Sequence, residues 1–183
     1  NEKISYRELS TRKAYEWALV SNKYDLKLKN IMYDFQLNHG IDCNFIKTSE
    51  KRKKKLLIAD MDSTIIKEES LDELAKLIGK EKEVSFITNE AMNGRIEFKE
   101  ALIKRVALFK GSSSSILETL KNSININNGA KELIKTMNMN GSVTVLVSGG
   151  FTFLTEYLKE ILGFKYTHAN SIQIIQTEFL KSE

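Results

Sequence analysis

The chain has 183 residues, of which 42% are hydrophobic and 9% aromatic, with 28 basic and 24 acidic side chains and no proline. These proportions are typical of an ordinary globular protein, and they exclude a disordered chain, a collagen-like chain and a disulfide-stabilised scaffold. The net charge of +4 is mild, and the longest apolar run is far shorter than the roughly 20 residues that cross a bilayer, so no membrane is expected as a partner.

The first 46 residues predict a helix, a second helix and a strand. The first helix lies in the polar-rich N-terminal stretch, and the second begins near Asp25 and ends at Gly40, a residue type that often follows the last turn of a helix. Residues 41–46 alternate with the two-residue period of a half-buried strand. Cys43 is the single cysteine, so no disulfide forms within the chain, which favours a reducing, cytoplasmic compartment.

A polar linker follows this segment. Residues 47–55, KTSEKRKKK, contain no large apolar side chain, and five consecutive basic residues occupy positions 51–55. A run of like charges is usually a solvated segment. No aromatic residue is interleaved with the run, so a nucleic-acid partner is not expected. The sequence therefore predicts two domains, residues 1–50 and 51–183.

Two short apolar runs, residues 56–59 and 143–147, predict strands of a parallel sheet that is covered on both faces, and hence an α/β fold. A helix between them begins with a capping box, Ser70 with Glu73, and ends at Gly79. Other helices are expected at residues 81–92, 97–110 and 129–139, and between Ser148 and Gly163. The long interval between the two strands predicts an inserted helical subdomain.

The first of these strands ends in two carboxylates. In an open parallel sheet, ligands bind beyond the carboxyl ends of the strands. Asp60 and Asp62 lie there, and burying both is costly unless a cation or a proton compensates their charge. This spacing indicates a metal site or an acid/base pair, although a D-x-D sequence by itself is as often only a turn.

The second strand ends in Ser148, Gly149 and Gly150, directly before a helix. A hydroxyl and glycine amides at the start of a helix can bind an anion, and phosphate is the obvious occupant. By itself, this tripeptide is more often a plain tight turn. A carboxylate nucleophile together with a phosphate seat predicts covalent phosphoryl transfer through an aspartyl-phosphate. We therefore expect Asp60 and Ser148 to face each other across one pocket.

Four stretches carry a family resemblance: KKLLIADMDSTII, EESLDELA, EAMNGRIEFKEALIKRVALFKG and VTVLVSGGF. Over about residues 54–180 the chain resembles the phosphoserine phosphatases of the haloacid dehalogenase (HAD) superfamily. The resemblance implies a Rossmann-type parallel sheet with an inserted helical cap at about residues 68–125. Residues 1–50 are similar, more weakly, to the end of the small ACT-like domain that some bacterial members carry.

The resemblance also implies roles for the residues at the strand ends. Asp60 would take the phosphoryl group, and Asp62 would protonate the leaving serine oxygen and then assist the attack of water. A Mg²⁺ ion would be held by the Asp60 carboxylate and the Asp62 main-chain carbonyl, together with waters and a phosphate oxygen. Ser148 and Gly149 would bind the phosphoryl oxygens.

Four further positions match the residues with which the family recognises its substrate. Glu69 would bind the ammonium and Arg105 the carboxylate of phosphoserine, while Met92 and Phe98 would form an apolar lid. Local patterns offer alternatives. Glu69 also suits the positive end of the helix that follows it, and Arg105 also suits a snorkelling arginine at the edge of an apolar stripe. Met92 and Phe98 are residue types that ordinarily lie in a core.

Two elements of the family pattern are absent from the 183 residues: a lysine that steadies the phosphoryl charge and a Gly-Asp loop that completes the magnesium site. Because this chemistry depends on charge stabilisation, we expect the chain alone to be nearly inactive. The natural protein is expected to continue past Glu183, so that the fold is truncated here. A sheet cut after two strands would leave apolar faces uncovered, which predicts either instability or burial against a partner chain, as in a homodimer.

The leading hypothesis is a Mg²⁺-dependent phosphatase whose small-molecule substrate is O-phospho-L-serine, in the step of serine biosynthesis that the resemblance implies. One alternative keeps the fold and changes the substrate to another small phosphomonoester. The other alternative is a catalytically incomplete module that binds a ligand without turnover.

Overall fold

The computed structural model describes residues 5–18, 26–46 and 53–172. The chain divides into two compact units, Asn1–Lys51 and Arg52–Glu183. The second unit contains a parallel sheet and, with it, both strand ends that carry the candidate residues.

The first unit begins with an antiparallel hairpin of β1 (Ser5–Ser10) and β2 (Ala14–Ala18). The expected first helix is therefore wrong. Arg7 and Glu16 lie opposite each other in the hairpin and form an ion pair of 2.6 Å. Pairs of opposite charge across two strands stabilise antiparallel pairing, and this contact between strands is not visible in the local helical spacing of the sequence.

The second expected helix is confirmed as α1 (Leu26–His39). It ends at Gly40, whose φ of 61° favours a residue without a side chain. Residues 41–46 form no strand, which corrects the expectation for this segment. A strand is stable when its backbone groups pair with those of another strand, and no strand pairs with this segment among the described residues.

Three parallel strands form the sheet of the second unit, in the order β3 (Leu56–Asp60), β4 (Val143–Phe151) and β5 (Tyr166–Asn170). The two strands that the sequence predicts are confirmed, and β5 is an addition. Because neighbouring parallel strands run in one direction, their carboxyl ends meet at one edge of the sheet. Asp60 pairs in register with Val147, so the two predicted motifs lie at the same edge.

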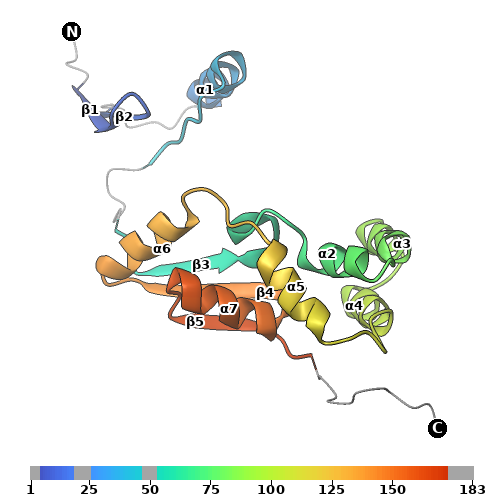
Figure 1. Ribbon diagram of the computed structural model, residues 1–183. Helices are drawn as coiled ribbons and strands as arrows, with labels where there is room; N and C mark the ends of the chain where they lie inside the picture. The colour runs from blue at the N-terminus through green and yellow to red at the C-terminus, as the bar shows by residue number, and fades with distance from the viewer. Residues whose placement is uncertain (1–4, 19–25, 47–52, 173–183) are drawn as a thin grey trace. The chain divides into compact units, whose positions relative to one another are not determined.

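Helices occupy the intervals between the strands, and α2, α3 and α4 extend beyond the carboxyl edge of the sheet (Figure 1). A five-residue turn, η1 (Met61–Ile65), follows β3 directly. Five helices lie where the sequence predicts them, and α5 is an addition. In chain order the helices are α2 (Ser70–Leu77), α3 (Glu81–Met92), α4 (Phe98–Ala107), α5 (Ser115–Ser123), α6 (Ala130–Met139) and α7 (Thr152–Leu162).

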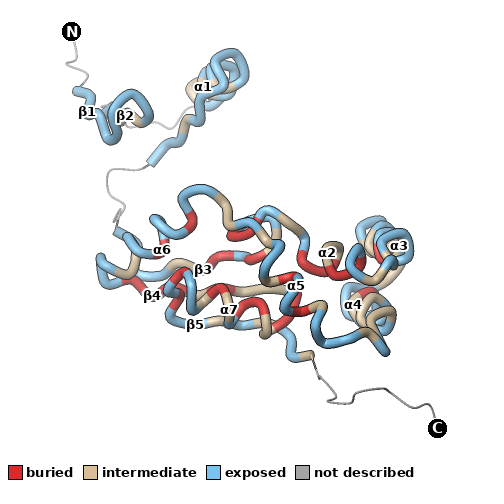
Figure 2. The backbone as a smooth tube through the Cα atoms, in the orientation of Figure 1, coloured by how far each residue is buried: buried red, intermediate tan, exposed pale blue. Residues whose placement is uncertain are grey.

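The core lies between the sheet and the helices α6 and α7. Leu146 of β4 and Leu154 and Leu158 of α7 are fully buried there, and Figure 2 shows buried residues along this interface. Right-handed connections that proceed in one direction across a sheet place their helices on the same face. On the other face, Leu56 and Ile58 are 52% and 59% exposed, so the expectation that both faces are covered is wrong for the described residues.

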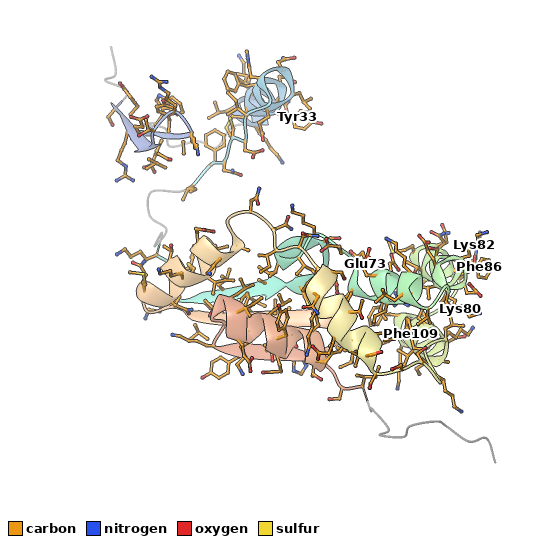
Figure 3. All side chains as sticks on the ribbon, in the orientation of Figure 1. Tyr33, Glu73, Lys80, Lys82, Phe86 and Phe109 are labelled. Atoms are coloured by element: carbon orange, nitrogen blue, oxygen red, sulfur yellow. The ribbon has the colours of Figure 1, made fainter. Side chains whose placement is uncertain are left out.

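The inserted helices are anchored to this core at one end. Phe109, just after α4, is half-buried and packs against the core cluster (Figure 3). Lys82 and Phe86 project outward from α3, and Phe86 is 66% exposed (Figure 3). Within the described ranges, the helices are too short and too polar to cross a membrane.

Candidate active site

The turn η1 follows Asp60, the last residue of β3, and contains Asp62. Asp60 begins this turn, and its Oδ1 accepts a hydrogen bond from the backbone N–H of Met61 at 2.8 Å. Ser63 has a left-handed backbone with a φ of 50°, which is uncommon for a residue with a side chain. The chain reverses there, and the N–H of Ser63 donates to the carbonyl of Glu68 at 3.1 Å. This tight turn brings Asp62 toward the start of α2.

Asp62 connects the two predicted motifs. Its Oδ1 accepts a hydrogen bond from the N–H of Ser70 at 2.8 Å, and its Oδ2 accepts one from the hydroxyl of Ser148 at 3.2 Å. The ends of β3 and β4 therefore belong to one site. Ser70 is the first residue of α2 and receives its cap from Asp62, so the capping box predicted for Ser70 and Glu73 is wrong.

Burial raises the pKa of Asp62 above its usual range. The hydrogen bonds from Ser70 and Ser148 act in the opposite direction without cancelling the effect of burial, and the negative charge of Glu69 adds to the increase. A carboxyl group with a raised pKa retains a proton more readily. This property suits a residue that donates a proton in one step and accepts one in the next.

Gly150 occupies a position where a side chain would be crowded. Its N–H donates to the hydroxyl oxygen of Ser148 at 2.8 Å. A Cβ built on Gly150 would lie 3.1 Å from Oγ of Ser148 and 3.2 Å from Oγ of Ser70. Both distances are shorter than ordinary van der Waals contact, so the glycine allows β4 and α2 to approach each other around Asp62.

Gly149 lies close to the ring of Phe98, since a Cβ built on Gly149 would be 3.2 Å from Cζ of that ring. Phe98 begins α4, so the inserted helices reach the end of β4. Asn170, at the end of β5, donates a hydrogen bond from Nδ2 to the Gly149 carbonyl at 2.8 Å. Sequence reasoning missed Asn170 because it missed β5. The available signal was a polar residue at the end of one more parallel strand.

Glu69 directly precedes α2, and its side chain is turned toward the aspartate turn. Its Oε1 accepts a hydrogen bond from the hydroxyl of Ser63 at 2.6 Å. It makes no side-chain hydrogen bond to the helix end, but it directly precedes α2. The alternative that its charge interacts with the positive end of this helix therefore stays a prediction. Ser63 is a second contact that sequence reasoning missed, because a bond between residues on both sides of a turn depends on the backbone conformation of that turn.

Arg105 is half-buried on α4, and its Nε donates to the Ala101 carbonyl at 3.4 Å. Burial raises the pKa of Asp72 on α2, and the positive charge of Arg105 partly offsets this effect. Asp62 also acts on the pKa of Asp72. Arg105 thus lies within electrostatic reach of the first turn of α2, which is the turn that Asp62 caps.

The two apolar lid candidates are exposed. Met92 and Phe98 are 83% and 62% exposed, so the alternative that they are core residues is wrong. Phe98 contacts Gly149. Met92 is the last residue of α3 and lies outside the core cluster, and none of the contacts described above ties it to the strand ends.

The oxygen donors at the end of β3 are few. The part of the chain that the structure describes holds no group of three or more His, Cys, Asp and Glu side chains able to bind a metal ion. The Asp60 carboxylate is exposed there, and the family resemblance adds the Asp62 main-chain carbonyl. Such a set fits Mg²⁺, which uses one or two carboxylates and keeps several waters, better than Zn²⁺, which prefers His and Cys.

The protein has a parallel α/β core with helices inserted after its first strand. Carboxylates lie at the end of one strand, and a serine hydroxyl with glycine amides lies at the end of the neighbouring strand. These features define the class of the protein as an α/β protein of the HAD type. The family model for haloacid dehalogenase-like hydrolases matches residues 57–181. The chain belongs to this family.

Several similar proteins with curated names are phosphoserine phosphatases. The chain is 38% identical over 183 residues to a probable phosphoserine phosphatase of Schizosaccharomyces pombe, covering 94% of this chain and 60% of the relative. It is 46% identical over 123 residues to the phosphoserine phosphatase of Archaeoglobus fulgidus, covering 67% and 36%. A solved phospho-aspartyl intermediate analogue of phosphoserine phosphatase is 40% identical, with a TM-score of 0.62, over 68% of this chain and 59% of that one. The chain thus spans less than two thirds of these relatives.

Proposed function

We propose that the intact protein hydrolyses O-phospho-L-serine to L-serine and phosphate through an aspartyl-phosphate intermediate. The observation that carries this proposal is the placement of Asp62 between the hydroxyl of Ser148 and the first N–H of α2. This contact joins an acid/base group to a phosphate seat at one sheet edge. The names of the similar proteins support phosphoserine as the substrate.

Asp60 is the nucleophile in this proposal. An oxygen of its exposed carboxylate attacks the phosphorus, and the bond from phosphorus to the serine oxygen breaks. Asp62 gives its proton to that leaving oxygen. Its raised pKa suits this step, because a carboxyl group with a raised pKa retains a proton more readily. In the second step Asp62 takes a proton from a water molecule, and the water oxygen attacks the phosphorus and releases Asp60. The Ser148 hydroxyl and the Gly149 N–H bind the phosphoryl oxygens.

Mg²⁺ is the proposed cofactor, held by the Asp60 carboxylate and the Asp62 main-chain carbonyl. When bound, it neutralises phosphoryl charge and orients the group for in-line attack. The remaining charge stabilisation comes from the strand ends, where the glycine amides and the start of a helix favour an anion. The Gly150 N–H holds the Ser148 oxygen in place. In this proposal the Ser148 O–H, which donates to Asp62 in the structure, turns to a phosphoryl oxygen when the substrate binds.

Recognition of the amino-acid part is assigned to Glu69, directly before α2, and to residues of the inserted helices. Glu69 binds the ammonium and Arg105 the carboxylate, because a planar guanidinium forms paired hydrogen bonds with a carboxylate. Phe98 closes over the strand end, as its contact with Gly149 supports. Met92 completes the apolar lid in this proposal.

Replacement of the nucleophile tests the reaction. In the intact protein with Mg²⁺, Asp60→Asn should lower kcat about 10³-fold or more, because it removes the group that forms the intermediate. Rapid acid quenching of the unmodified protein with phosphoserine, followed by mass spectrometry, should place a phosphoryl group on the peptide that contains Asp60. Binding of phosphoserine without any phosphorylated peptide would instead favour the ligand-binding module.

A comparison of substrates tests specificity. Phosphoethanolamine lacks the carboxylate of phosphoserine, so the protein should prefer phosphoserine by on the order of 100-fold in kcat/KM, the value of a charged hydrogen-bonded pair. Arg105→Ala should remove that preference while leaving the rate with phosphoethanolamine nearly unchanged. Equal rates for the two substrates in the unmodified protein would favour another small phosphomonoester.

A further inference from the structure

The inserted helices α2 to α5 are joined to the sheet through two chain segments that lie side by side. Ile66 and Ile126 form an antiparallel bridge. The N–H of Lys67 donates to the Asn125 carbonyl at 2.9 Å, and the N–H of Asn127 donates to the Ile65 carbonyl at 2.9 Å. We call residues 64–69 and 124–127 the connecting segments. Any movement of the inserted helices relative to the sheet must change the backbone conformation of these segments.

Side chains strengthen this pairing on both segments. Glu68 accepts two hydrogen bonds from Asn125, one from the backbone N–H at 2.9 Å and one from Nδ2 at 2.7 Å. Asn127 donates from its Nδ2 to the Thr64 carbonyl at 2.9 Å and to the Ile66 carbonyl at 3.2 Å. The Glu68 carboxylate therefore grips both the main chain and the side chain of a residue 57 positions away in sequence.

The hydrogen bonds from Asn125 also affect the pKa of Glu68. Its limited burial acts to raise its pKa, but the hydrogen bonds from the Asn125 side chain and backbone outweigh that effect and hold the pKa below its usual range. A carboxylate that accepts hydrogen bonds from two donors of one residue forms stronger bonds than a neutral acceptor would. The contact is therefore strongest in the charged form of Glu68.

Glu68 lies directly between this pairing and the candidate site. Its carbonyl accepts the N–H of Ser63, the residue with the left-handed backbone. The next residue, Glu69, accepts the hydroxyl of the same Ser63. The backbone of Glu68 is thus held on one side by the aspartate turn, and its side chain is held on the other side by Asn125, so the position of the Glu69 carboxylate depends on both.

We propose that Glu68 is a positioning residue, whose bidentate hydrogen bonding to Asn125 locks the two connecting segments and thereby fixes the Glu69 carboxylate beside the aspartate turn. The assignment of the substrate ammonium to Glu69 rests on the proposed function. The lock itself rests only on the contacts between the connecting segments. A lock of this kind reduces the freedom of the inserted helices to carry Glu69 and Phe98 away from the strand ends.

The experiment compares Glu68→Ala, Asn125→Ala and their double variant in the intact protein with the matched control Glu118→Ala. Glu118 is an exposed glutamate on α5 whose contact is an ion pair with Lys121. Hydrogen–deuterium exchange of the amides of Lys67, Asn125 and Asn127 measures the lock. Exchange should become about tenfold faster in Glu68→Ala and less so in Asn125→Ala, which keeps the backbone N–H that Glu68 accepts. It should be no faster in the double variant than in Glu68→Ala, and unchanged in the control.

The second readout is substrate preference, which a purely structural residue would not change. The test substrate is the phosphomonoester of 3-hydroxypropanoate, which keeps the carboxylate of phosphoserine and lacks the ammonium. Glu68→Ala should reduce the preference for phosphoserine about tenfold, through KM, and leave kcat for the ammonium-free ester within about twofold. Glu69→Gln should reduce the same preference. The double variant of Glu68→Ala and Glu69→Gln should lose no more of this preference than Glu69→Gln alone.

The outcomes separate the two proposals. Unchanged amide exchange rates in Glu68→Ala and Asn125→Ala would overturn the lock. Faster exchange with an unchanged preference for phosphoserine over the ammonium-free ester would show that Glu68 is only a structural residue and does not position Glu69. If the unmodified protein shows no preference for phosphoserine over the ammonium-free ester, the proposed substrate fails. The exchange rates of the three amides then still decide for or against the lock.

Discussion

The carboxylate of Asp62 is held between the N–H of Ser70 and the hydroxyl of Ser148, and burial raises its pKa. The folded protein therefore binds this proton more tightly than the unfolded chain does. Below the pKa of the unfolded chain the group is protonated in both states. As the pH rises through the folded-state pKa, ionisation of Asp62 reduces the stability of the fold.

Asp62→Asn should therefore raise the thermal midpoint of the metal-free protein at neutral pH. An amide keeps the acceptor for Ser70 and can donate to Ser148, and it carries no charge to bury. The gain should be absent below about pH 4, the usual range for an aspartate in an unfolded chain, and should grow toward neutral pH. Thermal scans across this range test it, with the exposed Asp34→Asn as the control. A gain of equal size at every pH would contradict the explanation.

Gly149 allows a second test at the scale of one residue. Its backbone φ does not require a glycine, but the nearby ring of Phe98 limits the space for a side chain. An added Cβ would lie 3.2 Å from the Phe98 ring, and the exposed ring would have to shift. We expect Gly149→Ala to lower kcat/KM by on the order of tenfold, because small displacements at a site are costly, with little change in stability. In protein that already carries Phe98→Ala, Gly149→Ala should cause no further loss. A full additional loss would show that the glycine acts independently of the ring.

At the scale of elements, α7 shows how burial on one face supports the strand end. Leu154, Leu158 and Leu162 recur at four-residue intervals and are 0%, 0% and 6% exposed. Leu158→Ala should lower the free energy of unfolding by about 2–5 kcal/mol, since it leaves a cavity in the core. Ile161→Ala, on the same helix but 40% exposed, should cost much less. Chemical denaturation of the two variants measures both values, and equal losses would contradict this view of the core.

The elements also show what a sequence can and cannot predict. Apolar runs that end in polar residues located β3 and β4, and with them Asp60, Asp62 and Ser148. β5, with the sequence YTHAN, has no such run, because its residues alternate between exposed and half-buried. The sequence therefore did not predict this strand or its terminal Asn170. The same limit applied to the hairpin β1–β2, whose pairing depends on contacts between two strands and not on the spacing of apolar residues along either one.

Contacts across turns were beyond the sequence for a related reason. The bond from Ser63 to Glu69 exists because Ser63 adopts a left-handed backbone. The grip of Glu68 on Asn125 joins residues 57 positions apart. Periodicity and motif spacing report which face of an element is apolar and where an element ends. They do not report which side chains come into contact across a turn. Those contacts determine the positions of the side chains in the candidate site.

At the scale of the whole molecule, the two units differ in how much apolar surface they bury. The core cluster lies entirely in Arg52–Glu183. In Asn1–Lys51, every residue whose burial the structure describes is at least partly exposed, including Trp17 at 58% and Tyr33 at 60%. The ACT-like character of residues 1–50 stays a prediction. Folding requires enough apolar burial to offset the conformational entropy of the ordered chain, and the described residues of the first unit supply little.

Residues 1–51, produced alone, should therefore show no cooperative thermal transition, whereas residues 52–183 should show one. A segment of this size rarely has sufficient core to be stable by itself, while the second unit keeps α6 and α7 on its sheet. Circular dichroism at 222 nm during heating, a wavelength that reports helix content, distinguishes a gradual change from a sigmoidal one. A sigmoidal transition in residues 1–51 that does not depend on concentration would show that the first unit has a core of its own. A transition whose midpoint rises with concentration would show that its exposed apolar side chains are buried by self-association.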